Sequence, residues 1–509
     1  MQASGSQVRD IESMQVKTEL RRETNWIGAF VIGLAGTILV TGVTGPVDAA
    51  LGAMAVPVFF ATAVMGVLLC FYLAEMAAMF PERTGGSPTY AYPAFLKWPR
   101  LAGHVNSFTS WAYWLGWAPV LSVNMLLVGI YIEALFKSTW NVDFSITTVQ
   151  IPNVGLQTNL GAILIGALLS VVLYLVSLYG IRLSAAVGIV LAIASGLPLV
   201  ILGFAPFIFS PHLVHFSNVL PFTVVGKSFW EAASISLVVQ FFFLTTWNAL
   251  AMEAAACYVG ECSDPAKDAP KAIIGEAALG LVIYTMVPLA FLVVLGFKAI
   301  AIDPYAMFVT FAGKIFGGQH SAVGLAGQWI ISLLLIAALM LSALNAIMGS
   351  ARSVYQIAVD GDFPRFFTHL NRHGVPDVSM TINTVMNIGV MFFGGAATIY
   401  VFSNVGYLIS FVPVLIAFWL LRRNEPNHAR PYRVPNWLTP VAPVLAVIFF
   451  LIWIVGGPLY SFNQGTGVAY FIGWAVLLTY VPLYYYRKLV EDRRPAAAGI
   501  AGTTKGLAK

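Results

Sequence analysis

The chain has 509 residues, of which 59% are hydrophobic and 10% are charged. Soluble domains carry roughly 25% charged residues, so the composition excludes an ordinary soluble enzyme, a disordered protein and a nucleic-acid-binding protein. It predicts a polytopic, all-α integral membrane protein. The formal net charge is +5. In a membrane protein such an excess reports topology rather than an anionic partner.

The first 25 residues are polar and predict a cytoplasmic tail without a cleavable signal. Twelve apolar segments then reach the length of about 20 residues that a spanning helix needs. These segments are 26–53, 55–79, 105–135, 159–179, 183–209, 229–256, 273–297, 324–352, 378–398, 400–421, 437–458 and 467–487. Cys70, Cys257 and Cys262 show no metal-binding spacing, so we expect free thiols.

The basic residues test this count of twelve. With the N-terminus in the cytoplasm, 23 of the 27 Lys and Arg residues fall on the cytoplasmic side. Cytoplasmic loops are enriched in Lys and Arg. The distribution therefore predicts a multi-pass protein of the cell membrane with both termini in the cytoplasm.

The first and sixth spans both contain a polar interruption. The first reads GTILVTGVTGP over residues 36–46, and the sixth reads TTWNALAME over residues 245–253. Glycine and proline disfavour a helix interior by about 1 and 3 kcal/mol. Interruptions at corresponding positions of two halves indicate an inverted-repeat transporter whose site lies at the breaks. Close packing of small residues is the alternative, and both stay open at this point.

Ionisable residues inside spans are functional candidates because burying them is costly. Asp48 follows the glycine-rich stretch of the first span, and Glu253 lies in the sixth. Each is open to a ligand or proton role or to a structural one. Glu75 and Glu231 are expected at the membrane interface.

Further candidates lie in the third and eighth spans. Trp111, Trp114 and Trp117 share one helix face by their spacing of three, and they could form a wall of a substrate cavity or an interfacial belt. Asn124 lies deeper in the third span, and Asn345 could contribute to a sodium site in the eighth.

Four segments are similar to motifs of the amino acid–polyamine–organocation (APC) transporters. They are Glu75–Tyr90 with its FPERTGG sequence, Gly260–Ile273 with SDPAKDAPKAI, Ser350–Pro364 with YQIAVDGDFP, and Leu421–Pro435. The motifs occur in the family's order, and the resemblance covers about residues 25 to 490. We therefore identify the chain as resembling an amino acid permease of the APC superfamily.

The resemblance implies five plus five inverted repeats, with discontinuous helices 1 and 6, and two additional helices. It divides the chain into a tail (1–25), a ten-helix core (26–421, repeats 26–210 and 229–421), a loop (422–436), two helices (437–487) and a cytoplasmic tail (488–509).

The resemblance also assigns the site. The substrate carboxylate is expected on the first-span motif, the amine on sixth-span carbonyls, and Trp247 over the substrate as an aromatic gate. The implied binding residues are Thr41, Gly42, Val43, Thr44, Trp247, Asn248, Ala249, Leu250 and Ala251.

We expect the first helix to break near Thr41–Gly42. That break would place Asp48 in the external vestibule, where its carboxylate would attract amines. Val40 and Ala251 replace glycines of the family. Glu253 matches the family's sixth-span glutamate and is a coupling candidate by the resemblance. Asp48, Trp114, Asn124 and Asn345 are coupling or gating candidates because of their own positions in the spans.

The resulting hypothesis is a secondary carrier of neutral or cationic amino acids, and not an enzyme. A polyamine or organic-amine carrier of the same fold is the alternative, and a membrane enzyme or a channel is more remote. No cofactor or metal is expected. Coupling to H⁺, coupling to Na⁺ and exchange stay open, although the fifth span lacks the lysine that some proton-coupled members carry. The expected partners are the substrate and the lipid bilayer, with no nucleic acid; the sequence leaves open whether the protein is a monomer or a homodimer.

Overall fold

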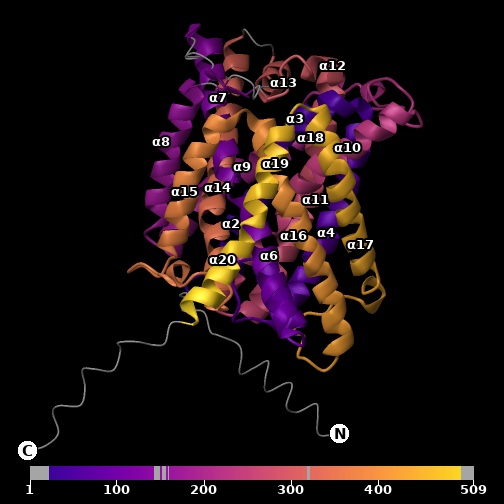
Figure 1. Cartoon of the computed structure of the whole chain (residues 1–509). Helices are drawn as coiled ribbons and strands as arrows, with labels where there is room; N and C mark the ends of the chain where they lie inside the picture. The colour runs from indigo at the N-terminus through magenta and orange to yellow at the C-terminus, as the bar shows by residue number, and fades with distance from the viewer. Residues whose placement is uncertain are drawn as a thin grey trace, which may run out of the picture.

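The computed structural model describes residues 22–142, 149–151, 156–158, 160–305, 307–317 and 321–493. These residues form a bundle of long helices that stand side by side (Figure 1). One short antiparallel pair of strands, β1 (Val149–Ile151) and β2 (Leu156–Thr158), is the exception. The all-α prediction is confirmed. Most of the two predicted tails lies outside the described residues.

The helices of the first half are α2 (Trp26–Thr37), α3 (Val40–Leu51), α4 (Ala55–Met79), α5 (Ser87–Ala91), α6 (Pro99–Trp117), α7 (Val120–Trp140), α8 (Leu160–Ser177) and α9 (Ile181–Phe209). The helices of the second half are α10 (Ala232–Leu250), α11 (Pro265–Leu295), α12 (Phe297–Ile300), α13 (Met307–Ile315), α14 (Ala322–Val359), α15 (Asp377–Val390), α16 (Ala396–Asn424), α17 (Val441–Leu451), α18 (Gly457–Asn463), α19 (Gly467–Leu478) and α20 (Tyr480–Tyr486).

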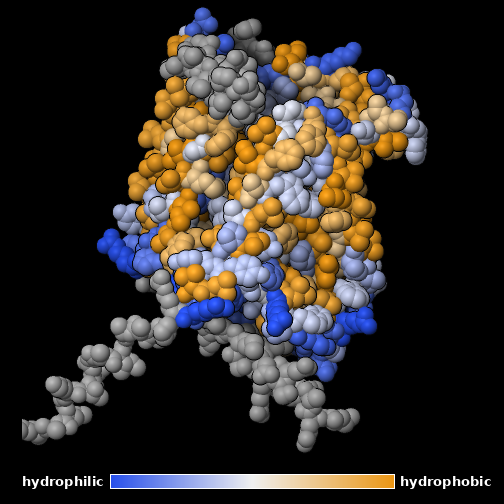
Figure 2. Space-filling view, in the orientation of Figure 1, coloured by the Kyte–Doolittle hydropathy of each residue, from blue (hydrophilic) through white to orange (hydrophobic). Residues whose placement is uncertain are grey.

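Apolar side chains cover the flank of the bundle, and hydrophilic ones gather at its two ends (Figure 2). Ten helical stretches of the described residues are long and apolar enough to cross a membrane. A bundle with an apolar belt and polar ends is the arrangement that a lipid bilayer requires. The protein is therefore a multi-pass membrane protein.

The twelve predicted spans and these ten stretches differ at two places. The first two predicted spans form one stretch, Trp26–Met79, because only short turns separate α2, α3 and α4. The predicted span 378–398 contains α15, which has 14 residues and ends in a short 3₁₀ turn. The count of twelve and the inverted repeat stay predictions.

Local sequence explains several helix boundaries. The Asn25 side chain accepts hydrogen bonds from the backbone N–H groups of Ile27 and Gly28 at 3.0 and 3.1 Å, and so caps α2. Pro99 and Pro265 stand in the first turns of α6 and α11, where a missing N–H is tolerated. Gly52, at φ +57°, makes the turn between α3 and α4.

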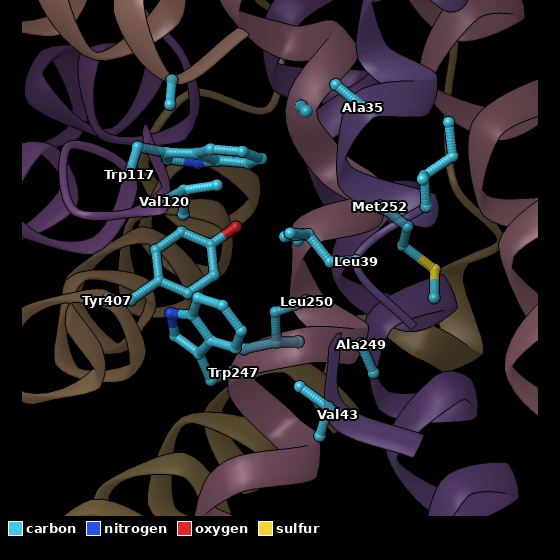
Figure 3. Packing of buried hydrophobic residues seen from close by; sticks show 14 of the residues in the cluster. Ala35, Leu39, Val43, Trp117, Val120, Trp247, Ala249, Leu250, Met252 and Tyr407 are labelled. Atoms are coloured by element: carbon cyan, nitrogen blue, oxygen red, sulfur yellow. The ribbon is translucent and has the colours of Figure 1, made fainter. Parts of the chain in front are cut away.

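Helix α11 runs through the interior of the bundle, where it packs against α2, α4 and α9. The last helices, α17 to α19, pack outside these against α10 and α16. A continuous apolar core fills the centre, and Figure 3 shows Trp117, Tyr407, Trp247, Leu250 and Val43 within it. The core therefore surrounds the two interrupted helices.

Candidate functional site

Two helix interruptions meet at the centre of the bundle. The first is a turn at residues 38–39, which separates α2 from α3. The second is the point where α10 gives way to a 3₁₀ helix, η5 (Ala251–Cys257). A Cβ atom on Gly36 would lie only 1.7 Å from the carbonyl oxygen of Ala251. The absence of a side chain at Gly36 is therefore what allows the two backbones to approach.

The predicted position of the first break, near Thr41–Gly42, was wrong by three residues. Residues 41–44 lie instead in α3, and their side chains are buried. The Thr44 hydroxyl donates to the Val40 carbonyl at 2.6 Å, a local bond that threonine can make within a helix. The N–H groups of Thr41 and Gly42 donate to the carbonyls of residues 38 and 39 at 3.2 and 3.1 Å. In this conformation, these two donors already have partners.

The break in the sixth span lies within the predicted stretch. Asn248, Ala249 and Leu250 still belong to α10, and Ala251 begins the 3₁₀ segment. The Ala251 N–H donates to the carbonyls of Asn248 and Ala249. In a 3₁₀ helix, each N–H group pairs with the carbonyl three residues earlier instead of four. Some peptide groups at the junction therefore lack a partner within the helix and depend on side chains of other helices.

Tyr284 of α11 connects the two interruptions. Its hydroxyl lies 2.9 Å from the carbonyl oxygen of Gly36 in α2 and 2.7 Å from that of Asn248 in α10. One hydroxyl proton is thus shared between carbonyls of both broken helices. Tyr284 was not predicted from the sequence, because a tyrosine in an apolar span carries no obvious functional signal.

Trp247 lies beside α3, and its ring is fully buried. The indole N–H donates to the Ser403 hydroxyl at 2.8 Å, and the ring centre lies 5.0 Å from that of Tyr400. The Tyr400 hydroxyl in turn donates to the Gly42 carbonyl at 3.0 Å. The indole therefore contacts α16, whose Tyr400 connects it to the Gly42 carbonyl of α3. Tyr400 and Ser403, one turn apart on α16, were not predicted.

Glu253 of η5 is fully buried and accepts hydrogen bonds from four neutral donors. Oε1 accepts from Tyr113 at 2.7 Å, from Tyr407 at 3.0 Å and from the Trp117 indole at 3.2 Å. Oε2 accepts from the Ser87 hydroxyl. The donors come from α5, α6 and α16, so this carboxylate ties three helices to the interrupted sixth one. We call these five residues the Glu253 cluster.

Glu276 of α11 is a second central acid, which the sequence analysis missed. Its Oε2 accepts the backbone N–H of Ala255 in η5 at 2.8 Å, and the side chain is completely buried. The signal was present: an acid stands near the start of the predicted 273–297 span, and acids inside spans are functional candidates.

Asp48 does not reach the solvent. The structure buries it completely within α3, and among the described residues neither carboxylate oxygen has a hydrogen-bond partner. The predicted position in an external vestibule was therefore wrong for this conformation, because α10, α11 and α12 pack around α3.

The remaining candidates lie in separate places. Trp114 stacks on Trp111 with ring centres 4.1 Å apart, and the Trp111 indole N–H donates to the Val476 carbonyl at 2.9 Å. Asn345 accepts from the Tyr258 hydroxyl. The Asn124 amide nitrogen is buried and has no partner within the described parts of the chain. The structure thus does not bring Trp114, Asn124 and Asn345 together as one group at the two breaks.

Ion pairs connect the helices at one end of the bundle. We call this end the basic face; its paired basic residues are Arg83, Arg422, Arg430 and Lys488. Arg83 pairs with Asp360 at 2.6 Å, and Lys488 pairs with Asp362 at 3.1 Å. Burial raises the pKa of the Asp362 carboxyl, and hydrogen bonds from Asn106 and Lys488 counter this rise. The pairs join the ends of α4, α14 and α20.

Glu75 was expected at the membrane interface and lies, buried, at the same face. Its carboxylate pairs with Arg422 at 2.5 Å and with Arg430 at 3.0 Å. It also accepts the Val434 N–H at 2.8 Å. The acid therefore fastens the loop after α16 to the end of α4.

Comparison with known proteins gives the family. The amino acid permease family profile matches residues 25–481. The branched-chain amino acid permease BcaP of Bacillus subtilis is 24% identical over 493 residues, which cover 92% of this chain and 94% of that protein.

Two further relatives carry other names. Solute carrier family 7 member 12 of Mus musculus is 25% identical over 232 residues, which cover 44% of this chain and 46% of that protein. The polyamine transporter PUT1 of Oryza sativa subsp. japonica is 24% identical over 426 residues, or 81% of this chain and 69% of that protein. The family profile spans nearly the whole chain, and it agrees with the membrane-spanning bundle. This protein belongs to the amino acid permease family of the APC superfamily, and it is a transporter.

Proposed function

We propose that this permease is a secondary active carrier that moves neutral or cationic amino acids by alternating access. The observation that carries the proposal is the contact of two interrupted helices, α2–α3 and α10–η5, with Tyr284 bonded to a carbonyl of each. Interrupted helices expose peptide N–H and C=O groups to a ligand in the middle of a membrane.

An amino acid offers the complementary charges. Its carboxylate would bind the N–H groups of Thr41–Thr44 at the start of α3, where the helix dipole also favours an anion. Its ammonium would donate to the carbonyls of Asn248–Ala251. Trp247 would cover the bound substrate. Because the N–H groups of Thr41 and Gly42 have partners in this conformation, binding would require the turn at residues 38–39 to open.

The side chains around the breaks favour a neutral substrate within this class. Val43, Trp247 and Leu250 are buried in one apolar cluster (Figure 3). The nearest acid of the sixth helix, Glu253, already accepts four hydrogen bonds. A cationic substrate side chain would therefore have to compete with neutral donors that are already in place.

A polyamine carrier is the second candidate, supported by the likeness to a protein named as a polyamine transporter. A polyamine has no carboxylate, so the start of α3 would lack an anionic ligand. This difference ranks polyamines below amino acids.

For the arrangement in the membrane, we propose twelve spans with inverted repeats in the cell membrane. The basic face would lie in the cytoplasm together with both termini. The distribution of 23 of 27 basic residues supports this orientation.

Counterflow in proteoliposomes tests the proposed function. Vesicles loaded with one unlabelled amino acid should take up the same labelled amino acid faster than empty vesicles, because a carrier exchanges across its site. A panel of neutral, cationic and acidic amino acids and putrescine would rank the substrates. Exchange of putrescine without exchange of any amino acid would overturn the amino acid assignment.

A further inference from the structure

We propose that Glu276 is the proton-binding group that couples substrate movement to a proton gradient; this inference rests on the proposed transport function. It commits the carrier to H⁺ and assigns the proton to a carboxyl group on α11, rather than to Glu253 or Asp48.

The geometry of Glu276 leaves one oxygen available. Oε2 accepts the Ala255 N–H at 2.8 Å, whereas Oε1 is buried and has no hydrogen-bond partner in the described part of the chain. A Cβ atom on Gly33 of α2 would lie 2.6 Å from Oε2. The carboxyl group therefore lies where the interrupted first helix, the interrupted sixth helix and α11 touch one another.

Glu276 and Glu253 differ sharply in what stabilises a negative charge. Glu253 accepts four hydrogen bonds, which is about the full capacity of a carboxylate. Glu276 accepts one. A buried carboxylate without enough donors is costly, and two nearby carboxylates disfavour each other's charge. A single proton added to this pair is therefore best placed on Oε1 of Glu276.

The neighbours of Glu276 supply no compensating cation. The titratable groups that face it are Cys70 of α4, Glu253 and Cys257 of η5, Tyr258 and Tyr284. Helix α2 has no titratable residue, and Arg182 of α9 is exposed and pairs with Glu23. Arg352, which lies beside Cys257 and Tyr258, is paired with Glu261. Among the described residues, no unpaired positive charge faces this carboxyl group.

Protonation of Glu276 would act on the sixth-helix break. As a carboxylate, the group holds the Ala255 N–H in a charge-assisted hydrogen bond; as a neutral acid, it accepts the same N–H more weakly. The proton bound on one side of the membrane is released on the other and regenerates the carboxylate. A neutral, zwitterionic amino acid would therefore move together with one positive charge.

The experiment uses the full chain in proteoliposomes, with the amino acid that shows the strongest counterflow. For the wild-type protein, an inward proton gradient should drive accumulation, with internal acidification reported by a trapped pH dye. For Glu276→Gln, gradient-driven uptake should fall to the level seen without a gradient, while the label still exchanges. Glu231→Gln, at an exposed acid immediately before α10, is the matched control and should respond to the gradient like the wild type.

The outcomes separate the two proposals. If wild-type vesicles exchange no amino acid, the proposed function fails, and this inference fails with it. If they exchange label but a sodium gradient alone drives accumulation, or if Glu276→Gln accumulates substrate like the wild type, only this inference fails.

A second measurement needs no variant. Dicyclohexylcarbodiimide modifies protonated carboxyl groups in apolar surroundings, so peptide mass spectrometry of the treated wild-type protein should find the adduct on Glu276. An adduct on Glu253, with Glu276 unmodified, would overturn the inference even if the glutamine variant did not fold.

Discussion

The Arg352 guanidinium donates to both carboxylate oxygens of Glu261, at 2.5 and 3.2 Å, and both side chains are buried. The guanidinium also lies 5.3 Å from the centre of the Tyr258 ring. The pair joins α14 to the segment that follows η5. It therefore fixes the end of the interrupted sixth helix at the basic face.

Breaking this pair from one side should destabilise the protein strongly. Arg352→Met leaves the Glu261 carboxylate buried without its cation, and a loss of this kind costs about 3–5 kcal/mol. We expect a lower midpoint of thermal unfolding in detergent. The double variant Arg352→Met/Glu261→Leu removes both charges and should recover much of the loss. Equal midpoints for the single variant and the wild type would contradict this role.

Transport should depend on both the indole ring and the N–H group of Trp247. Trp247→Leu removes the ring that packs against Tyr400 and should abolish most uptake. Trp247→Phe keeps an aromatic ring but loses the bond to Ser403, a difference of about 1 kcal/mol. We therefore expect a roughly fivefold change in KM for the phenylalanine variant. If the leucine variant transports every substrate like the wild type, Trp247 does not cover the site.

Tyr284→Phe should weaken the contact between the two helix breaks. The carbonyls of Gly36 and Asn248 would lose their shared donor and keep the backbone N–H groups of Leu39 and Ala251. The loss is that of one hydrogen bond, about 1 kcal/mol. We expect a lower unfolding midpoint but a larger upward shift on adding substrate, because an ammonium group would no longer compete with the hydroxyl. Tyr174→Phe, at a hydroxyl that contacts Thr381 near the surface, is the matched control. A smaller substrate shift than in the wild type would contradict the expected competition.

Cys262 should react slowly with alkylating reagents near neutral pH. Burial raises the pKa of this thiol to about 12 from its ordinary value of 9.0, so the reactive thiolate is scarce. Because the folded state favours the neutral thiol, this residue's contribution to stability is present below pH 9 and declines as the pH rises toward 12.

Iodoacetamide labelling between pH 7 and 9, read by peptide mass spectrometry, checks the Cys262 prediction. An introduced Ser263→Cys, at the exposed neighbouring position, should react much faster at each pH. Equal rates at the two positions would show that the segment opens readily at the basic face.

Much of the fold could be predicted because it depends on composition along single segments. Runs of apolar residues gave the long helices, and the polar stretch around Asn248 predicted an interruption close to the observed one. Glycines and threonines weaken a helix without specifying which peptide group loses its partner. The first break was therefore predicted near Thr41–Gly42, whereas it lies at residues 38–39.

The contacts of the site depend on how helices are rotated against each other, and a single sequence does not specify this. Tyr284 lies 248 residues from Gly36 along the chain, yet its hydroxyl bonds to that carbonyl. The grouping of Ser87, Tyr113 and Tyr407 around Glu253 likewise requires three separate helices. Glu276 is the exception, because its position inside an apolar segment can be read from the sequence alone.

The shared hydroxyl of Tyr284 changes what a binding measurement on this protein reports. A ligand whose ammonium reaches the Gly36 or Asn248 carbonyl must first displace a hydrogen bond that already exists. The measured affinity is then the difference between two sets of bonds. A ligand that makes good contacts with these carbonyls can therefore still show a low measured affinity. Removal of the Tyr284 hydroxyl would raise that affinity and show how strong the contacts are.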